Sequence, residues 1–440
     1  MDFGHNIFVD IQEKLQPISN TIQEKIKLCS HDEKAISIGD LGDIISKHKK
    51  WKECLPRVEP FYAVKCNDIY PVIRLLADKG LSFDCASKAE IQKMLDLGVD
   101  PSRIIYANTF KQLSFIKYAA ENGVSLMTFD CEDELTKIKK EYPQANLVLR
   151  ISPQSNNKVI YHLGRKFGCH PSTALKVLQF AKKLELNVIG ISFHVGSGCL
   201  EAGAFEAAIE QSRRVFDLGL SVGFSMHILD IGGGFPGQKN VHTNITFEEI
   251  AAAVNLSLDK YFPGNDVRII AEPGRYYVAT SFTIGTNIIT KKIVTDEENV
   301  LPERDLHDHP TAKNENLRMY YVNEGIYGSF LTCFTDPGCY LPSHFKDNHE
   351  EVLYNSIIWG PTCAAVDLVI DKIKLPDLST GDWIYFKDMG AYSITTATNF
   401  NSMPRVEEYF TCEKKLWQDE KVSESDTSSS DNNIYSRQIT

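Results

Sequence analysis

Three short segments of the chain carry side chains that could do chemistry together. Lys65 ends the apolar run Phe-Tyr-Ala-Val-Lys (61–65), a glycine-rich turn occupies residues 229–237, and Ala-Glu-Pro-Gly-Arg stands at 271–275. They supply a primary amine, backbone N–H groups without neighbouring Cβ atoms, a carboxyl group and a guanidinium. Pyridoxal phosphate needs an amine for its Schiff base, N–H donors for its phosphate and a charged partner for its ring nitrogen. The three segments therefore predict a pyridoxal phosphate site.

The elements that must position these residues follow a regular rhythm between residues 60 and 275. Short runs of β-branched and aromatic residues alternate with stretches whose apolar residues recur at helical spacing, such as 88–97, 111–122 and 204–218. Eight such strand–helix repeats favour a closed (β/α)8 barrel, and an open doubly wound sheet is the alternative. The predicted strands are Phe61–Lys65, Ser82–Ser87, Ile104–Asn108, Leu126–Asp130, Asn146–Ser152, Val188–Val195, His227–Gly232 and Arg268–Gly274.

The rhythm changes after residue 276, where predicted strands follow one another without regular helices between them. They are Ser281–Val294, Arg318–Asn323, Glu351–Trp359 and Asp382–Lys387. We therefore expect an α/β chain with a barrel and a second, mostly antiparallel β-domain. A polar stretch at 295–317 is expected to be a mobile loop. The expected divisions are an N-terminal segment that joins the β-domain (1–36), the pyridoxal phosphate-binding barrel (37–280), the β-domain (281–412) and a disordered acidic, serine-rich tail (413–440).

Composition narrows the classes of partner. The formal net charge of −11 argues against nucleic acid or an anionic membrane surface as a partner. The sequence has no apolar run of the length that a transmembrane helix needs, and its N-terminus lacks the pattern of a secretory signal. The 11 cysteines show no Cys-x-x-Cys spacing, so we interpret them as reduced thiols rather than as disulfides or a metal site. These features lead us to expect a cytoplasmic protein.

In a (β/α)8 barrel the chemistry lies at the C-terminal ends of the strands, and phosphate often binds after strands seven and eight. Each polar residue at these ends has an ordinary structural interpretation on its own: a solvated lysine, a satisfied core histidine or a tight glycine turn. Their convergence on one predicted rim favours a site. The candidates are Lys65, Asp84, Arg150, His194, Ser197, Gly232, Gly233, Gly234, Glu272, Gly274 and Arg275.

The residue types suggest separate roles. Lys65 would form the Schiff base, and the three glycines would let backbone N–H groups approach a phosphate that Ser197 and Arg275 also contact. An ionised Glu272 would keep the pyridine nitrogen protonated and make the ring a stronger electron sink. His194 would stack on the face of the ring.

Several long motifs resemble the eukaryotic ornithine decarboxylase family. They include Phe-Tyr-Ala-Val-Lys-Cys-Asn-Asp (61–68), Ser-Phe-His-Val-Gly-Ser-Gly (192–198), Asp-Ile-Gly-Gly-Gly-Phe-Pro-Gly (230–237), Tyr-Val-Asn-Glu-Gly-Ile-Tyr-Gly-Ser-Phe (321–330) and Trp-Gly-Pro-Thr-Cys (359–363). The resemblance extends from about residue 36 to residue 412. It implies an alanine-racemase-type barrel with a C-terminal β-domain (pyridoxal phosphate fold type III), and a head-to-tail homodimer with two shared active sites.

Carried over residue by residue, the resemblance implies a role for each matching position. Lys65 is the Schiff-base lysine, Glu272 contacts the ring nitrogen, and Cys363 comes from the other subunit to protonate Cα after carbon dioxide leaves. Further cofactor contacts are implied for Asp84, Arg150, His194, Ser197, Gly234, Gly274, Arg275 and Tyr392. Pairs that bridge the family's dimer match Lys166 with Asp367, and Asp130 with Lys292.

One departure from the family pattern affects the expected substrate. The ornithine decarboxylases follow the cysteine with an aspartate, which clamps the distal ammonium of the substrate together with a second aspartate. The second matches Asp336, but the first is Ala364 here, and Thr335 replaces a tyrosine. With Tyr327 also assigned to the substrate, we expect a pocket shifted from ornithine towards an apolar aliphatic amino acid, with leucine as the best single candidate. Retained ornithine decarboxylation is the alternative.

A second alternative belongs to another functional class. The family includes antizyme inhibitors, which are non-catalytic regulators that bind antizyme, and the segment Lys111–Asn146 resembles the antizyme-binding region of the family. Against a non-catalytic chain, the residues expected to hold the cofactor and to transfer the proton are all present. The sequence therefore predicts a pyridoxal phosphate-dependent amino-acid decarboxylase.

Overall fold

The computed structural model describes residues 9–28, 33–153, 159–161, 166–237, 245–294, 317–335, 340–345 and 352–418. The chain divides into two compact units, one of residues 43–279 and one that combines 1–42 with 280–440. Most of the stretch predicted to be a mobile loop (295–316), most of the predicted disordered tail (419–440) and Asp336 lie outside the described residues.

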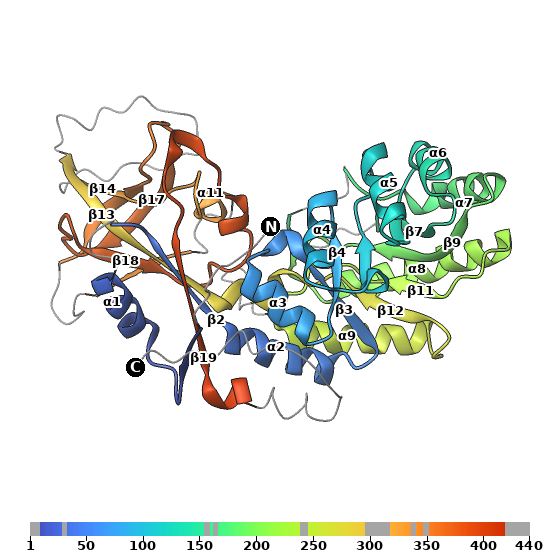
Figure 1. Cartoon of the computed structure of the whole chain (residues 1–440), viewed down its shortest axis with the longest axis horizontal. Coiled ribbons are helices and arrows are strands. Elements are labelled where there is room, and N and C mark those ends of the chain that lie inside the picture. Colours follow the sequence, from blue (N-terminus) through green and yellow to red (C-terminus); the bar gives the residue numbers. More distant parts are fainter. Residues whose placement is uncertain are drawn as a thin grey trace. The chain divides into compact units, whose positions relative to one another are not determined.

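Within the described part of residues 43–279, eight parallel strands close into a barrel (Figure 1). Each is a short apolar run flanked by polar or glycine-containing turns, as expected for strands buried on both faces. The closed barrel confirms the predicted (β/α)8 fold and excludes the open sheet. In order around the barrel the strands are β11 (Ile228–Asp230), β12 (Arg268–Ala271), β3 (Val58–Ala63), β4 (Ser82–Cys85), β5 (Ile104–Tyr106), β6 (Leu126–Phe129), β7 (Asn146–Ile151) and β9 (Asn187–Phe193).

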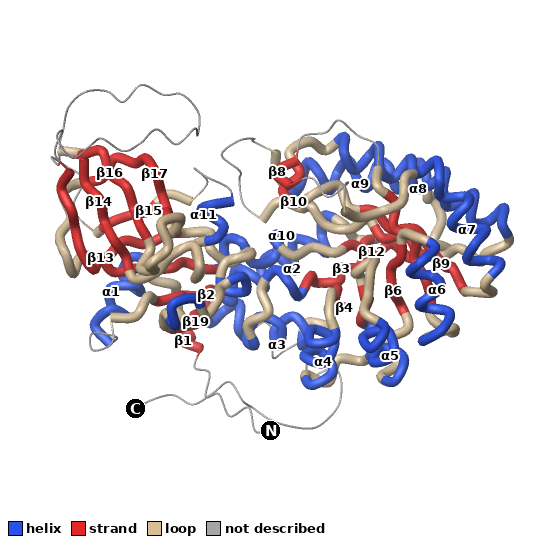
Figure 2. The backbone as a smooth tube through the Cα atoms, turned by 90° about the horizontal axis from the view of Figure 1, so that it is seen from above, coloured by secondary structure: helices blue, strands red, loops and turns tan. Residues whose placement is uncertain are grey.

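The helices of this unit surround the strands (Figure 2). Two of them begin at side-chain caps that the sequence encodes: Ser87 accepts a hydrogen bond from the Glu90 N–H, and Thr246 forms a capping box with Glu249. The capped helices are α4 and α9, and the full set is α2 (Leu41–Cys54), α3 (Tyr70–Asp78), α4 (Lys88–Asp96), α5 (Leu113–Glu121), α6 (Glu132–Glu141), α7 (Ala174–Lys183), α8 (Gly203–Val222), α9 (Phe247–Tyr261) and the short α10 (Arg275–Val278).

Apolar side chains fill the interior of the barrel, so its centre is a packed core and not a channel. Phe61, Val148 and Ile270 are fully buried within this cluster, which draws members from strands on all sides. Because the interior is closed, polar side chains can meet a ligand only beyond the ends of the strands.

The second unit is a mostly antiparallel sheet, as predicted, and nine strands belong to it within the described residues. Residues 9–40 contribute two of them, the second mostly in the range predicted for the barrel: β2 pairs with β13 and β19, and β1 pairs with β19. The strands are β1 (Val9–Gln12), β2 (Ile36–Asp40), β13 (Phe282–Val294), β14 (Leu317–Val322), β15 (Pro342–His344), β16 (Tyr354–Trp359), β17 (Leu368–Leu375), β18 (Trp383–Phe386) and β19 (Glu407–Glu413). Two helices, α1 (Ile18–Leu28) and α11 (Leu331–Thr335), accompany the sheet.

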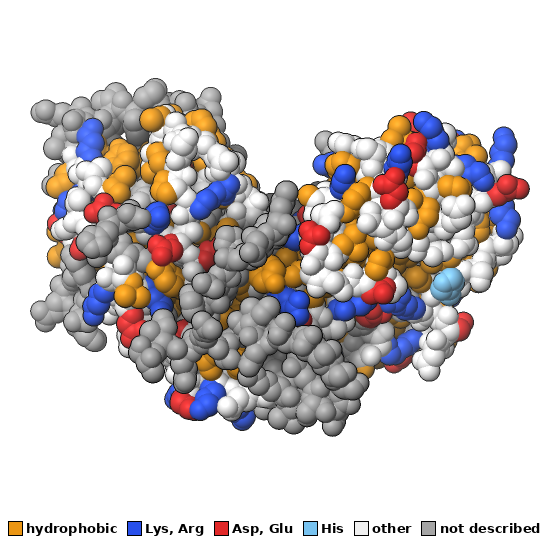
Figure 3. Space-filling view, in the orientation of Figure 1, with side chains coloured by type: hydrophobic (Ala, Val, Ile, Leu, Met, Phe, Trp, Pro, Cys, Tyr) orange, Lys and Arg blue, Asp and Glu red, His pale blue; other side chains and the backbone are white. Residues whose placement is uncertain are grey.

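The surface of the described part of the chain mixes both signs of charge. On the face shown in Figure 3, Lys and Arg side chains lie among Asp and Glu side chains over the helices of the barrel. Among the described residues, none of the helices combines the length and the hydrophobicity needed to cross a membrane.

Candidate active site

Lys65 and Asp84 meet at the C-terminal end of two adjacent barrel strands. The backbone pairs Ala63 of β3 with Asp84 of β4, and β3 ends there, two residues before the predicted end. Lys65 therefore lies in a one-turn 3-10 helix, Val64–Cys66, and not in the strand itself. Its Nζ forms an ion pair with the carboxylate of Asp84, which is fully buried, while the lysine side chain is 40% exposed. The amine is thus held by one acid and remains open to a reactant.

Two further acids lie buried beyond the neighbouring strands. Asp230 is the last residue of β11 and Glu272 directly follows β12; their exposed fractions are 0% and 6%. Burial, followed by the negative charges of Asp230 and Asp84, raises the pKa of Glu272 well above its usual range. Burial raises the pKa of Asp230 to about 6, against the opposing effect of the Gly232 N–H, which donates to Asp230 Oδ1 at 2.8 Å. The protein without its cofactor therefore crowds three carboxyl groups around one lysine.

This acid set fits a protonated pyridine ring. Asp84 Oδ1 and Glu272 Oε1 are buried and have no hydrogen-bond partner among the described residues. A buried acceptor without a donor costs free energy, about 1–3 kcal/mol or more for a charged group. A cationic N–H donor brought into the site would remove that cost, and the ring nitrogen of pyridoxal phosphate is such a donor. The residues present are therefore suited to hold this cofactor.

His194 carries a neutral imidazole. The Gly196 N–H donates to His194 Nδ1 at 3.0 Å, so this ring nitrogen holds no proton. Burial, followed by the positive charges of Arg150 and Lys65, lowers the pKa of His194 well below its usual range. A Cβ atom on Gly233 would lie 2.8 Å from Nε2, so only glycine lets the ring occupy this position. A neutral, flat ring suits stacking, the role that the sequence suggested.

The glycine-rich turn has a packing reason that the sequence interpretation did not include. Gly232 and Gly234 adopt φ values of 61° and 109°, in the region that favours glycine. A Cβ atom on Gly232 would lie 2.0 Å from the Phe193 carbonyl oxygen, and one on Gly234 would lie 2.6 Å from the Gly196 carbonyl oxygen. The Glu272 N–H also donates to the Gly232 carbonyl at 2.7 Å. The turn thus joins the ends of β9, β11 and β12 closely, besides presenting N–H groups.

The remaining barrel candidates lie on the same rim. Ser197 opens the short strand β10 (Ser197–Cys199), which pairs with β8 (Val159–Tyr161). Gly274 precedes α10, whose first residue is Arg275, and a Cβ atom on Gly274 would lie 2.7 Å from the Cβ atom of Cys66. The packing of Gly274 against the 3-10 helix thus connects the segment after β12 with the turn that carries Lys65.

Arg150 is oriented by an aromatic pair that the sequence analysis did not identify. The guanidinium lies 4.8 Å from the ring centroid of Phe167, and Phe167 stacks on Phe110 with 5.5 Å between the ring centroids. Lys166 Nζ lies over both rings. Such contacts hold a cation in place by the attraction of the ring quadrupole. The signal in the sequence was Arg-Lys-Phe (165–167), two cations beside an aromatic residue. This pattern is too short to predict which distant residue the phenylalanine contacts.

The other predicted site residues belong to the second unit. Cys363 and Ala364 lie in the loop between β16 and β17, where Cys363 is exposed and Ala364 is partly buried. The Cys363 N–H donates to Asn401 Oδ1 at 2.8 Å, and the ring of Tyr327 packs against Phe400 with 4.6 Å between the ring centroids. The structure thus brings Tyr327 and the Cys363 loop to neighbouring segments of one unit.

Two predicted site residues of this unit are placed only by their elements. Thr335 is the last residue of α11 and is exposed, and Tyr392 has a φ of 56°. A third, Asp336, lies outside the described residues. Their roles at the cofactor and the substrate stay predictions.

Both acids of the predicted subunit-bridging pairs have hydrogen bonds within their own chain. Asp130 Oδ2 accepts the Gly168 N–H at 2.8 Å. Asp367 is 1% exposed and accepts hydrogen bonds from Ile326 and Thr362. The pairings with Lys292 and Lys166 therefore stay predictions.

Comparisons with known proteins agree with this geometry. Residues 41–279 match the family described as "Pyridoxal-dependent decarboxylase, pyridoxal binding domain". The chain is 48% identical to ornithine decarboxylase from Rattus norvegicus over 88% of this chain and 83% of the relative. It is 45% identical to antizyme inhibitor 2 from Xenopus laevis, again over 88% and 83%. The crystal structure of the Paramecium bursaria Chlorella virus arginine decarboxylase bound to agmatine superposes with a TM-score of 0.80 at 33% identity, covering 89% of this chain and 99% of that one.

Proposed function

We propose a substrate for this chain, which belongs to the eukaryotic ornithine decarboxylase family of pyridoxal-dependent decarboxylases. The chain is a pyridoxal phosphate-dependent carboxy-lyase. Its substrate is an apolar aliphatic L-amino acid, for which leucine is the best candidate, and its products are carbon dioxide and the primary amine. The observation that carries this proposal is the composition of the loop between β16 and β17.

This loop has lost the charge that would bind a distal ammonium group. Ala364, Ala365 and Val366 follow Cys363, where the family pattern begins with an aspartate. Asp367 does not replace that aspartate, because it is 1% exposed and both of its carboxylate oxygens already accept hydrogen bonds within the loop region. The loop therefore offers methyl groups where an ornithine site needs a carboxylate, which favours an apolar side chain.

The residues of the chain divide the work of the reaction. Bound pyridoxal phosphate supplies an electron sink for the electron pair that the departing carboxylate leaves behind. Lys65 would hold the cofactor covalently, Glu272 would pair with its ring nitrogen, and the neutral His194 would stack on its ring. After carbon dioxide leaves, the Cys363 thiol breaks its S–H bond and gives the proton to Cα of the substrate. The resulting thiolate regains a proton from water.

A substrate survey with one variant tests the proposal. Carbon dioxide release by the cofactor-loaded protein is measured across the common L-amino acids and ornithine, for wild type, Ala364→Asp and the neighbouring control Ala365→Asp. We expect leucine or another aliphatic substrate to be the best for wild type. Restoring one acid of a buried charge pair recovers roughly 2–5 kcal/mol, so ornithine kcat/KM should rise about 30-fold to several thousandfold in Ala364→Asp only.

The alternative substrate is ornithine, which the name of the Rattus norvegicus relative favours. Wild-type turnover of ornithine alone, with little gain in Ala364→Asp, would reject the aliphatic substrate. Carbon dioxide release would still stand, so the decarboxylase activity and the choice of substrate fail independently.

We also propose that the active protein is a homodimer in which Cys363 serves the site of the partner subunit. Mixing Lys65→Ala with Cys363→Ala subunits would then give heterodimers with one intact site. Random exchange would restore about a quarter of wild-type amine production, because half of the dimers carry one good site of two. Mixed subunits without any recovery would place both residues in a site made by one chain.

Antizyme binding is a second function that a specific observation favours, namely the similarity to Xenopus laevis antizyme inhibitor 2. Within the segment 111–146, Lys111 is not available to a partner, because its buried Nζ pairs with Glu134 Oε1 at 2.9 Å. The exposed Leu113 on α5 is available. Titration of purified antizyme should show binding that Leu113→Glu weakens about tenfold, while Leu175→Glu on α7 does not. Equal binding by both variants, or none by wild type, would reject this interface.

A further inference from the structure

The backbone of Asp367 makes hydrogen bonds to two residues of the loop that carries Cys363. Strands β16 and β17 pair up to Trp359 and Leu368, and the residues between them form the loop. The Gly360 N–H donates to the backbone carbonyl of Asp367 at 2.8 Å, and the Asp367 N–H donates to the carbonyl of Ala364 at 3.0 Å. The backbone of Asp367 therefore shapes the loop from its C-terminal end.

The side chain of Asp367 reaches back across the same loop. Its Oδ2 accepts the Thr362 N–H at 3.0 Å and the Thr362 hydroxyl at 2.6 Å. Its Oδ1 accepts the Ile326 N–H at 2.9 Å, from the segment that contains Tyr327. One carboxylate thus joins the residue before Cys363 to a second loop of the same unit. Hydrogen bonds to a charged acceptor are among the stronger ones in proteins, so Asp367 links the two loops strongly.

The Asp367 carboxylate lies close to the backbone of two glycines. A Cβ atom on Gly325 would lie 2.4 Å from Asp367 Oδ1, and one on Gly360 would lie 2.3 Å from the same oxygen. Both positions therefore require glycine if the aspartate is to stay where it is. Cys363 is exposed in the loop that Asp367 holds, and its N–H donates to Asn401.

We propose that Asp367 is a positioning residue that fixes the Cys363 thiol for proton transfer to Cα. This inference rests on the proposed function, in which Cys363 is the proton donor. Fixing the loop matters because the proton has a competing destination. With pyridoxal phosphate bound, a proton given to a carbon of the cofactor instead of Cα would lead, after hydrolysis by water, to an aldehyde in place of the amine, with the amine nitrogen left on the cofactor. Asp367 therefore sets the ratio of the two products.

The first test measures that ratio in Asp367→Asn, which keeps the size of the side chain and removes its charge. The control is Asp371→Asn, an exposed position on β17. Cofactor-loaded variants are assayed for carbon dioxide, amine and aldehyde with the best wild-type substrate. We expect carbon dioxide release to stay within a few-fold of wild type while the aldehyde share rises about tenfold in Asp367→Asn only, since a misplacement of 1 Å can cost on the order of a hundredfold in one rate.

Cys363→Ala separates the failure of this inference from the failure of the proposed function. If Cys363→Ala leaves the product ratio unchanged, the thiol is not the proton donor and the proposed function fails. If Cys363→Ala raises the aldehyde share and Asp367→Asn does not, the donor stands and the positioning role of Asp367 is wrong.

A second measurement needs no activity and protects against a variant that folds poorly. Deuterium exchange of the peptide that covers 360–368 includes the Thr362 amide, which donates to Asp367. We expect about tenfold faster exchange in Asp367→Asn and a smaller increase in Thr362→Val, with wild-type exchange in Thr362→Ser, which keeps the hydroxyl. Unchanged exchange in Asp367→Asn and Thr362→Val would mean that the hydrogen bonds from Thr362 to Asp367 do not hold the loop, and the proposal would then be wrong.

Discussion

The buried carboxyl groups of the candidate site in the barrel and those of the second unit have different hydrogen-bond environments. In the barrel, Asp84 and Glu272 each have a buried oxygen without a partner among the described residues. In the second unit, both oxygens of Asp367 accept hydrogen bonds, and Glu324 Oε1 accepts the N–H groups of Gly325 and Ser329 at 3.0 and 2.9 Å. The two acids of the candidate site each lack a donor as the chain stands alone, whereas both oxygens of Asp367 have one.

The difference separates two uses of a buried acid. A carboxylate whose hydrogen bonds are all made within the chain stabilises backbone geometry, and removing it costs stability. A carboxylate left without donors costs stability itself, and it is retained where a ligand supplies the missing donor. Variants of the two groups should therefore have opposite effects on the protein without its cofactor.

The largest expected effect is at the lysine that the acids of the candidate site surround. Lys65→Ala removes the amine proposed to hold the cofactor and leaves Asp84 without its ion-pair partner. We expect a loss of kcat of roughly a thousandfold or more, together with the loss of the visible absorbance of the bound cofactor. Absorbance spectra and amine production report the two effects separately. Wild-type absorbance in this variant would assign the covalent link to another residue.

A smaller effect is expected where both oxygens of the acid have a donor. Asp367→Ala leaves the donors of Ile326 and Thr362 buried without an acceptor, which should lower the free energy of unfolding by about 3 kcal/mol. Urea unfolding followed by fluorescence measures the loss against Asp371→Ala on the same strand. Equal stability of the two variants would mean that the Asp367 hydrogen bonds contribute nothing net.

Glu272→Gln should stabilise the cofactor-free protein, whereas Asp367→Ala destabilises it. The Glu272 variant removes one of the crowded acids, so the cofactor-free protein should become more stable, while kcat falls about a hundredfold, or about 2.7 kcal/mol. Thermal unfolding without and with cofactor, and initial rates, measure both effects. The control is Glu59→Gln, at the opposite end of β3, where Glu59 pairs with Arg268 at the surface. A destabilised cofactor-free Glu272→Gln would contradict the contrast between the two groups.

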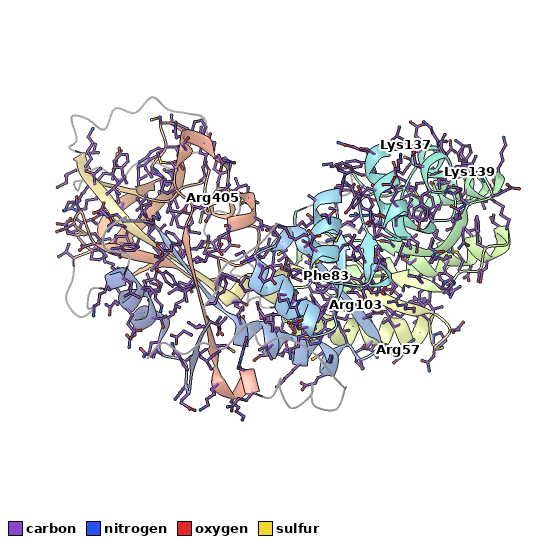
Figure 4. All side chains as sticks on the ribbon, in the orientation of Figure 1. Arg57, Phe83, Arg103, Lys137, Lys139 and Arg405 are labelled. Carbon is purple, nitrogen blue, oxygen red and sulfur yellow. The ribbon has the colours of Figure 1, made fainter. Side chains whose placement is uncertain are left out.

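The smallest expected effect concerns pH. Burial raises the pKa of Glu324 to about 7, against its two N–H donors and the positive charge of Arg405 on the same unit (Figure 4). The folded chain therefore binds this proton more tightly than the unfolded chain does, so stability from this group falls as pH rises from about 4.5 to about 7, by on the order of 2 kcal/mol. Glu324→Gln should flatten this part of the pH profile of unfolding. An identical slope in wild type and variant would exclude the assignment.

The sequence was sufficient for the barrel because most of its strands are short local runs of apolar residues that alternate with helical patterns. The strand ends were less certain: the strand before Lys65 stops at Ala63, since a 3-10 turn follows. Helix α9 was not among the helical stretches named from the sequence, although Thr246 and Glu249 have the spacing of a capping box. Strand β17 was also missed, although polar and apolar residues alternate in its second half, Lys-Ile-Lys-Leu (372–375).

The candidate site also contains residues that the sequence could predict and contacts that it could not. Residues in long motifs, such as Lys65, His194 and Glu272, could be selected as candidates from the sequence, and the structure places them at the strand ends; their roles stay predictions. Asp230 stood in one of those motifs but received no role, because its burial beside Glu272 depends on the pairing of β11 with β12. The contacts of Phe167 and Asp367 join segments far apart in the chain, and no local pattern encodes such contacts.

The pairing of β2 with β19 has a consequence for the order of synthesis. These strands lie at opposite ends of the described chain, and the whole barrel separates them in sequence. A growing chain can complete the barrel as soon as residue 279 has emerged from the ribosome, whereas β2 must wait for β19 near the end of translation. We therefore expect the barrel to form first during synthesis and the sheet that bears Cys363 to close only after β19 has been made, so that an early-terminated chain would carry Lys65 in the barrel without a finished sheet.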